Sequence, residues 1–134
     1  MTQQELEQFE QESNEYVDML GITGYNTGTY YENNPAQRWR EFDEIYSRIE
    51  EKFSSFAKFP WIITEFASSS IGGDKVKWID NMFSNFPKYK NIKIAVWFNA
   101  ADYDTANNKV ARPYWLDETP ETLEAFKRGL ANSP

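Results

Sequence analysis

The fold of this chain is decided by residues 61–70, which read WIITEFASSS. The first four have high β-strand propensity, and a carboxylate, Glu65, follows them directly. Small hydroxyl residues come next, and residues 72–74 (GGD) then open a helix-like pattern. In parallel α/β proteins the carboxyl ends of the strands carry the functional groups. Glu65 is therefore the first candidate for a functional residue, and the alternative is a solvated or ion-paired carboxylate at a strand end.

Predicted strands and helices alternate along the chain. Apolar runs predict strands at 16–23 and 92–98 beside the one at 61–66. Apolar residues spaced by three and four predict a helix over 35–56, and further helices begin at 74 and 119. Residues 3–14 predict a weak, frayed helix, and residues 99–117 predict a long polar loop. This order favours an α/β fold of three parallel βα units in a single domain, 1–134.

The amino-acid composition excludes several kinds of catalytic site, metal site and binding partner. The chain has 134 residues, a net charge of -7, no Cys and no His. This excludes Cys/His metal sites, Cys nucleophiles and Ser-His-Asp triads, so acid–base work falls to carboxylates, Tyr or Lys. The acidic balance argues against nucleic acid and anionic membranes as partners, whereas a neutral polymer is compatible with it. We expect no metal and no cofactor.

Three predicted strands end near residues with complementary chemistry. Because parallel strands have their carboxyl ends at one edge of a sheet, Tyr25, Glu65 and Trp97 are expected to converge there. Glu65 suits attack on an anomeric carbon, Tyr25 suits a hydrogen bond to that carboxylate, and Trp97 offers an apolar face to a sugar ring. Each also has a plainer interpretation, with Tyr25 as a turn residue and Trp97 as part of the core.

Four motifs together resemble the glycoside hydrolases of family 26. They are residues 16–26 (YVDMLGITGYN), 63–68 (ITEFAS), 72–79 (GGDKVKWI) and 95–99 (AVWFN), and the resemblance runs from about Glu15 to the last helix. The resemblance implies an endo-β-1,4-mannanase with a (β/α)8 barrel. It also implies that Glu65 is the catalytic nucleophile, that Tyr25 orients it, and that Trp97 forms the floor of the subsite for the cleaved sugar.

The chain departs from this family in what it lacks. The family's general acid is a Glu preceded by a His, on a strand for which this sequence has no counterpart, and a whole barrel needs roughly 250 residues. We therefore expect the C-terminal part of a barrel, with its sixth to eighth strands, carrying the nucleophile but not the acid/base. Such a chain is expected to be inactive alone and to self-associate or to bind the missing N-terminal half. Its expected location is extracellular, with the native signal peptide absent, and its expected substrate is β-mannan.

Two alternatives stay open. The first is another retaining β-glycanase, acting on β-glucan or xylan, because the nucleophile strand is common to these enzymes. The second is a non-catalytic carbohydrate-binding module, in which aromatic side chains stack on sugars and Glu65 is incidental. The residues that serve as platforms in that case are Trp97, Tyr30, Tyr31 and Trp115. In the enzyme interpretation, Tyr30 and Trp115 join Trp97 as candidate substrate-binding residues.

Overall fold

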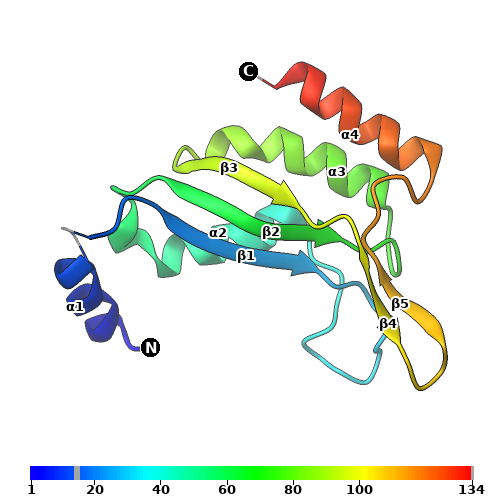
Figure 1. Ribbon diagram of the computed structural model, residues 1–134, viewed down its shortest axis with the longest axis horizontal. Coiled ribbons are helices and arrows are strands. Elements are labelled where there is room, and N and C mark those ends of the chain that lie inside the picture. The colour runs from blue at the N-terminus through cyan, green and yellow to red at the C-terminus, as the bar shows by residue number, and fades with distance from the viewer. Residues whose placement is uncertain (14–15, 134) are drawn as a thin grey trace.

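A three-stranded parallel sheet forms the centre of the fold. The computed structural model describes residues 1–13 and 16–133. Strands β1 (Leu20–Asn26), β2 (Trp61–Ser68) and β3 (Ile92–Trp97) lie in the order β1-β2-β3 (Figure 1). The register shifts between β1 and β2, and again between β2 and β3. Such bulges reverse the face to which the following residues point.

The helices cover one face of this sheet. They are α2 (Phe42–Lys52), α3 (Lys75–Asn85) and α4 (Pro120–Asn132), with short 3₁₀ turns at Ser54–Phe56 and Phe86–Lys88. Phe42 from α2, Ile63 from β2 and Trp78 from α3 are among the side chains that form the main core on this face. The opposite face of the sheet leaves Thr64, Glu65 and Val96 exposed.

Helix α1 (Gln3–Ser13) packs beside the amino ends of β1 and β2. Its Leu6 is 3% exposed and joins a second apolar cluster with Phe56, Phe59 and Trp61. Asn14 and Glu15 lie outside the described residues. Asn14 is the last residue of the predicted 3–14 helix, and the family resemblance starts at about Glu15. Within residues 1–13 and 16–133, no helix has the length and apolarity that crossing a membrane requires.

The stretch predicted as a polar loop, 99–117, instead contains a β-hairpin. Strands β4 (Ala101–Asp104) and β5 (Lys109–Pro113) pair antiparallel in a sheet of their own. The turn between them includes Asn108 at φ 53°, a left-handed conformation that Asn tolerates well. Charged residues interrupt the apolar pattern of both strands, ADYD and KVARP, and so concealed them in the sequence.

The predicted partial (β/α)8 barrel is wrong. The three parallel strands are present, but the chain is a small mixed α/β domain in which they form an open sheet beside a separate antiparallel hairpin. Among the described residues, β1 and β3 each pair with β2 alone. Barrel strands close into a ring with a defined tilt and stagger, and nothing in this open sheet provides that closure.

Two predicted element boundaries are also wrong. The first strand begins at Leu20 rather than at residue 16, and α2 begins at Phe42 rather than at residue 35. The segment before α2 is held by tertiary hydrogen bonds: Arg40 N donates to Asn26 Oδ1, and Trp78 Nε1 donates to Arg40 O. These bonds compete with helical geometry, and the apolar spacing alone could not reveal them.

The predicted starts of two helices, at residues 74 and 119, are confirmed as helix caps. Asp74 accepts a hydrogen bond from Lys77 N at the start of α3, and Thr119 accepts one from Thr122 N at the start of α4. Pro120 occupies the first turn of α4. Capping depends on residues within one turn of each other, so the sequence specifies it directly.

Gly28→Ala is expected to destabilise the protein by about 2–4 kcal/mol. Gly28 has φ +69°, and an added Cβ would lie 2.2 Å from the Ile71 carbonyl oxygen. Left-handed strain and overpacking each cost about 1–3 kcal/mol. Urea unfolding would measure the loss. Gly21→Ala is the control, because that Cβ meets only the Thr64 methyl group, at 3.1 Å, and φ there is not positive. Equal losses for the two variants would contradict the prediction.

Candidate functional site

Glu65 lies on the open face of the sheet. Along β2, Ile63 and Phe66 are buried against the helices, while Thr64 and Glu65 are both exposed. This break in the alternation coincides with the register shift between β2 and β3. The bulge thus leaves a carboxylate facing solvent in the middle of an otherwise buried strand.

Tyr25 is the hydrogen-bond partner of this carboxylate. It comes from β1, and its hydroxyl donates to Oε1 of Glu65. Burial, followed by the hydrogen bond to Glu65, raises the pKa of Tyr25 well above its usual range. Tyr25 therefore remains a protonated donor across the whole physiological pH range.

Two aromatic rings that sequence reasoning overlooked surround Tyr25. The centroid of the Tyr114 ring lies 5.1 Å from that of Tyr25, and the Phe98 ring lies 6.1 Å away, edge-on. Tyr114 follows β5 directly and is 2% exposed. The signal that pointed to it was slight: an aromatic pair, Tyr114 and Trp115, within a stretch that otherwise reads as polar.

The ends of β1 and β2 are joined by a buried polar pair. Asn26 Nδ2 donates to Ser68 Oγ over 2.8 Å, and both side chains are fully buried. Asn26 also accepts from Arg40 N, so its amide is used on both sides. Buried polar groups that are fully paired specify one geometry. This pair fixes β1 against β2 on the carboxyl side of Tyr25 and Glu65.

The structure does not place Trp97 with Glu65. Its ring packs on the helix side of the sheet, 5.4 Å from Phe66 and 5.8 Å from Phe126, measured between centroids. Trp97 and Phe66 are register partners, and Trp97 packs against the core that contains Phe66. The indole N–H donates to Tyr114 O over 2.8 Å.

The remaining candidates lie elsewhere. Tyr30 donates its hydroxyl to Asp104 Oδ2 over 2.9 Å and lines a cleft of about 720 Å³ with Tyr31 and Asn107. Trp115 is half-buried, and its carbonyl accepts from Lys75. Of the predicted site residues, the structure brings together Tyr25 and Glu65, and it leaves Tyr30 and Trp115 in loops.

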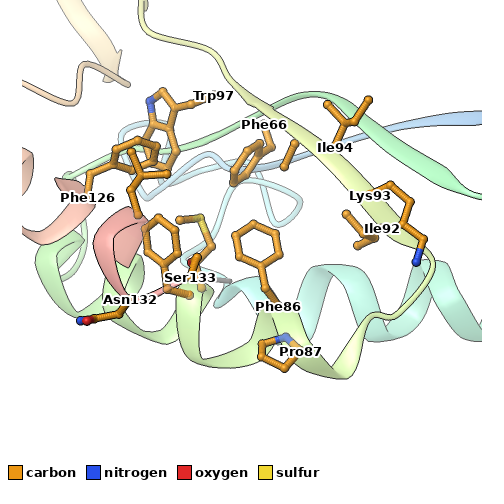
Figure 2. A pocket seen from close by; sticks show the side chains of 14 residues that line it. Phe66, Phe86, Pro87, Ile92, Lys93, Ile94, Trp97, Phe126, Asn132 and Ser133 are labelled. Atoms are coloured by element: carbon orange, nitrogen blue, oxygen red, sulfur yellow. The ribbon is translucent and has the colours of Figure 1, made fainter. Parts of the chain in front are cut away.

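A second hollow is apolar and lies away from Glu65. Figure 2 shows this groove of about 500 Å³ between α3, α4 and β3, with Phe86 and Trp97 among the side chains that line it. Its lining carries no carboxylate, and Lys93 is the charged side chain in it. No three Asp or Glu side chains gather as a possible metal site within residues 1–13 and 16–133.

The arrangement around Glu65 suits nucleophilic chemistry. Tyr25 holds one carboxylate oxygen of Glu65, a residue that is exposed to solvent. The hydrogen bond orients the carboxylate and so fixes the direction from which it can attack. The site therefore presents an oriented carboxylate on the open face of the sheet.

The chain is similar to part of one known enzyme. No protein-family model matches the chain. Its sequence is 34% identical to part of Endoglucanase H from Acetivibrio thermocellus over 116 residues, which is 86% of this chain. The chain spans 12% of the length of that relative. It is thus similar to part of a glycoside hydrolase.

Proposed function

We propose that this chain carries the nucleophile of a retaining β-glycan hydrolase and that β-glucan is its substrate. The observation that carries the proposal is the exposed Glu65 carboxylate held by the Tyr25 hydroxyl. The similarity to an endoglucanase supports the reaction class. The resemblance to family 26 implies mannan instead, and we place glucan first because the relative's name specifies a glucanase.

In the proposed reaction, Oε2 of Glu65 attacks the anomeric carbon of the bound sugar. The bond from that carbon to the glycosidic oxygen breaks, and the departing oxygen takes a proton from a general acid. The resulting glycosyl ester on Glu65 is then hydrolysed by water, which restores the carboxylate. Tyr25 holds Oε1 throughout, so that the other oxygen keeps its direction.

A retaining glycosidase needs a second carboxyl group about 5–5.5 Å from the first. Because the chain spans only 12% of the length of its relative, we propose that a part of the parent protein outside this sequence supplies the acid/base. Because general acid–base catalysis contributes about 10²–10⁴-fold, this chain alone should hydrolyse unactivated polysaccharide very slowly. Robust hydrolysis of β-glucan or mannan by the purified chain would contradict this.

An activated reagent tests the proposal without a general acid. A 2-deoxy-2-fluoro-β-cellobiosyl fluoride loses fluoride on attack, forming a stable ester with the nucleophile. We expect the protein's mass to rise by one glycosyl group, with the label on the peptide that contains Glu65. The matching mannobiosyl reagent decides the substrate. Faster labelling by the mannosyl reagent would favour mannan, and labelling at another residue would overturn the assignment of Glu65.

We further propose an extracellular location. Cell-wall β-glycans are polymers too large to enter a cell, so an enzyme that cleaves them within the chain must meet them outside. Fractionation of the producing cells, with immunodetection of this chain, would test the location. Recovery in the cytoplasmic fraction alone would contradict it.

Tyr25→Phe is expected to slow labelling of Glu65 by about 10–100-fold. The change removes one hydrogen bond to a charged group, worth about 1.5–3 kcal/mol, and leaves the ring packing intact. The measurement is the labelling rate constant at saturating reagent. Tyr103→Phe is the matched control, because Tyr103 is 61% exposed and should label at the unaltered rate. An unchanged rate for Tyr25→Phe would show that the hydroxyl does not assist Glu65.

A further inference from the structure

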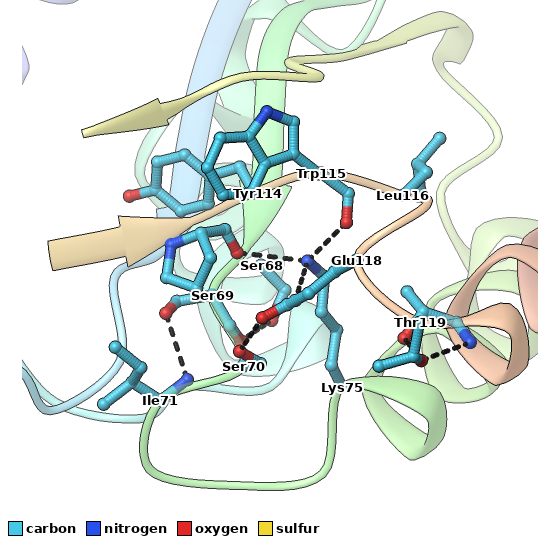
Figure 3. Close-up of polar contacts among 12 residues, drawn as sticks. Ser68, Ser69, Ser70, Ile71, Lys75, Tyr114, Trp115, Leu116, Glu118 and Thr119 are labelled. Atoms are coloured by element: carbon cyan, nitrogen blue, oxygen red, sulfur yellow. Dashed lines mark hydrogen bonds and ion pairs between the residues drawn. The ribbon is translucent and has the colours of Figure 1, made fainter. Parts of the chain in front are cut away.

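Three consecutive carbonyl groups after β5 are held by side chains from the parallel sheet and its helices. Lys75 Nζ donates to Pro113 O over 3.1 Å and to Trp115 O over 2.8 Å. Between them, Tyr114 O accepts from the indole N–H of Trp97. Figure 3 shows the two bonds from Lys75 on either side of Tyr114. Each carbonyl group of residues 113–115 is therefore held by a side-chain hydrogen bond.

The ammonium group that makes two of these bonds is buried. The side chain of Lys75 is 3% exposed, and its third bond goes to Glu118 Oε2 over 2.9 Å. The other oxygen of Glu118 accepts from Ser70 Oγ over 2.5 Å, so Ser70 after β2, Lys75 at the start of α3 and Glu118 before α4 are joined (Figure 3). All three N–H donors of the ammonium group thus have a partner. Burying a charge is unfavourable unless it is paired in this way.

The segment held by Lys75 carries the ring that packs on Tyr25. Tyr114 is buried, its ring centroid lies 5.1 Å from that of Tyr25, and 6.2 Å from that of Phe98. A shift of the Tyr114 backbone would open one side of Tyr25. Because reaction rates fall steeply when a reacting group is displaced by about 1 Å, such a shift should reach Glu65.

We propose that Lys75 is a positioning residue for the Tyr25–Glu65 pair, acting through the carbonyl groups on either side of Tyr114. Its consequence for catalysis rests on the proposed function, whereas its effect on the position of Tyr114 does not. Lys75 touches neither sugar nor reacting atoms. It locks the loop after β5 against α3 so that the Tyr114 ring encloses Tyr25.

The position of Tyr114 is tested by nuclear magnetic resonance on the full chain with labelled tyrosine rings. We expect Lys75→Met to weaken the nuclear Overhauser contact between the Tyr114 and Tyr25 rings. Trp97→Phe keeps an aromatic ring but removes the indole donor, and it should weaken the same contact without leaving a buried charge unpaired. Lys88→Met is the matched control, because Lys88 pairs with Asp43 over 2.8 Å on a side chain that is 58% exposed.

The effect on catalysis is tested with the fluorinated reagent. Lys75→Met should lower the labelling rate constant at saturation by about 10–100-fold and change the reagent's dissociation constant less than about 2-fold. Lys75→Arg, which keeps the charge, should restore part of the rate, and Lys88→Met should leave both quantities unchanged. A merely structural role would not separate the rate from the binding in this way.

The outcomes discriminate between the two proposals. Folded Lys75→Met and Trp97→Phe proteins that keep the Tyr114–Tyr25 contact would overturn the inference, even where stability has fallen. Loss of the contact with an unchanged labelling rate would overturn its catalytic part. Absence of labelling in every protein, including the unaltered chain, would overturn the proposed function. In that case the ring contact would still decide whether Lys75 positions Tyr114.

Discussion

Glu65→Gln is expected to abolish transfer of a glycosyl group from the fluorinated reagent to the protein. The amide keeps the size of the side chain and can still accept from Tyr25, so the fold and the pair are preserved. Its oxygen is a far weaker nucleophile than a carboxylate oxygen. Removing a covalent nucleophile costs on the order of 10⁴–10⁶-fold in rate, which is more than any other change proposed here. Mass spectrometry of the intact protein, followed over time, measures the loss.

A second variant of Glu65 tests for the gain of a reaction rather than for its loss. Glu65→Ala leaves space beside the anomeric carbon, and azide ion should enter it, attack that carbon and displace the leaving group of an activated β-glycoside. The product would be a glycosyl azide of inverted configuration.

The labelling experiment with the fluorinated reagent has its own matched control, Glu50→Gln on the exposed side of α2, which should be labelled at the unaltered rate. Labelling of Glu65→Gln at the normal rate would exclude Glu65 as the nucleophile.

Phe42→Ala is expected to lower the free energy of unfolding by about 3–5 kcal/mol, the range for deleting a buried aromatic ring. Phe42 is fully buried at the start of α2. Its ring contacts five others, with centroid distances from 4.5 Å to Tyr46 up to 6.2 Å to Phe66. Since a domain of this size is stable by about 5–15 kcal/mol, the loss removes a large share of the total.

Urea titration and thermal melting measure this loss, and the midpoint should fall by roughly 10–20 °C. The control is Phe9→Ala, because Phe9 in α1 is 48% exposed and its loss should matter much less. A Phe42→Ala protein as stable as the Phe9→Ala protein would mean that the core around α2 is not the one described. The result would also put in doubt the burial of Ile63 and Phe66, on either side of Glu65.

The sequence predictions that the structure confirms rest mainly on local sequence patterns. The strand at residues 61–66 lies within β2, and the caps Asp74 and Thr119 begin α3 and α4. These features depend on residues close together in the chain, where propensity and capping act directly. The pairing of Tyr25 with Glu65 was expected from strand order alone, because parallel strands have their carboxyl ends at one edge.

The predictions that failed depended on distant contacts. The helix expected from residue 35 is displaced by the hydrogen bonds of Arg40 to Asn26 and Trp78. The sequence did not reveal the hairpin of β4 and β5, because charged residues interrupt the apolar pattern of both strands. The partial barrel was carried over from a family resemblance, and an open sheet of three strands takes its place.

By itself, then, the sequence determined the chemistry available to this protein and the order of its parallel strands. Without Cys or His, acid–base work falls to carboxylates, Tyr or Lys, and the strand propensity around Glu65 places one such carboxylate on β2. Only the tertiary structure decided which aromatic rings stand beside it. One extra residue in β2 puts Glu65 on the open face of the sheet, whereas Trp97 packs on the helix side and Tyr114 packs against Tyr25. Because the faces of a strand alternate residue by residue, one extra residue reverses them, and no local pattern reveals where it lies.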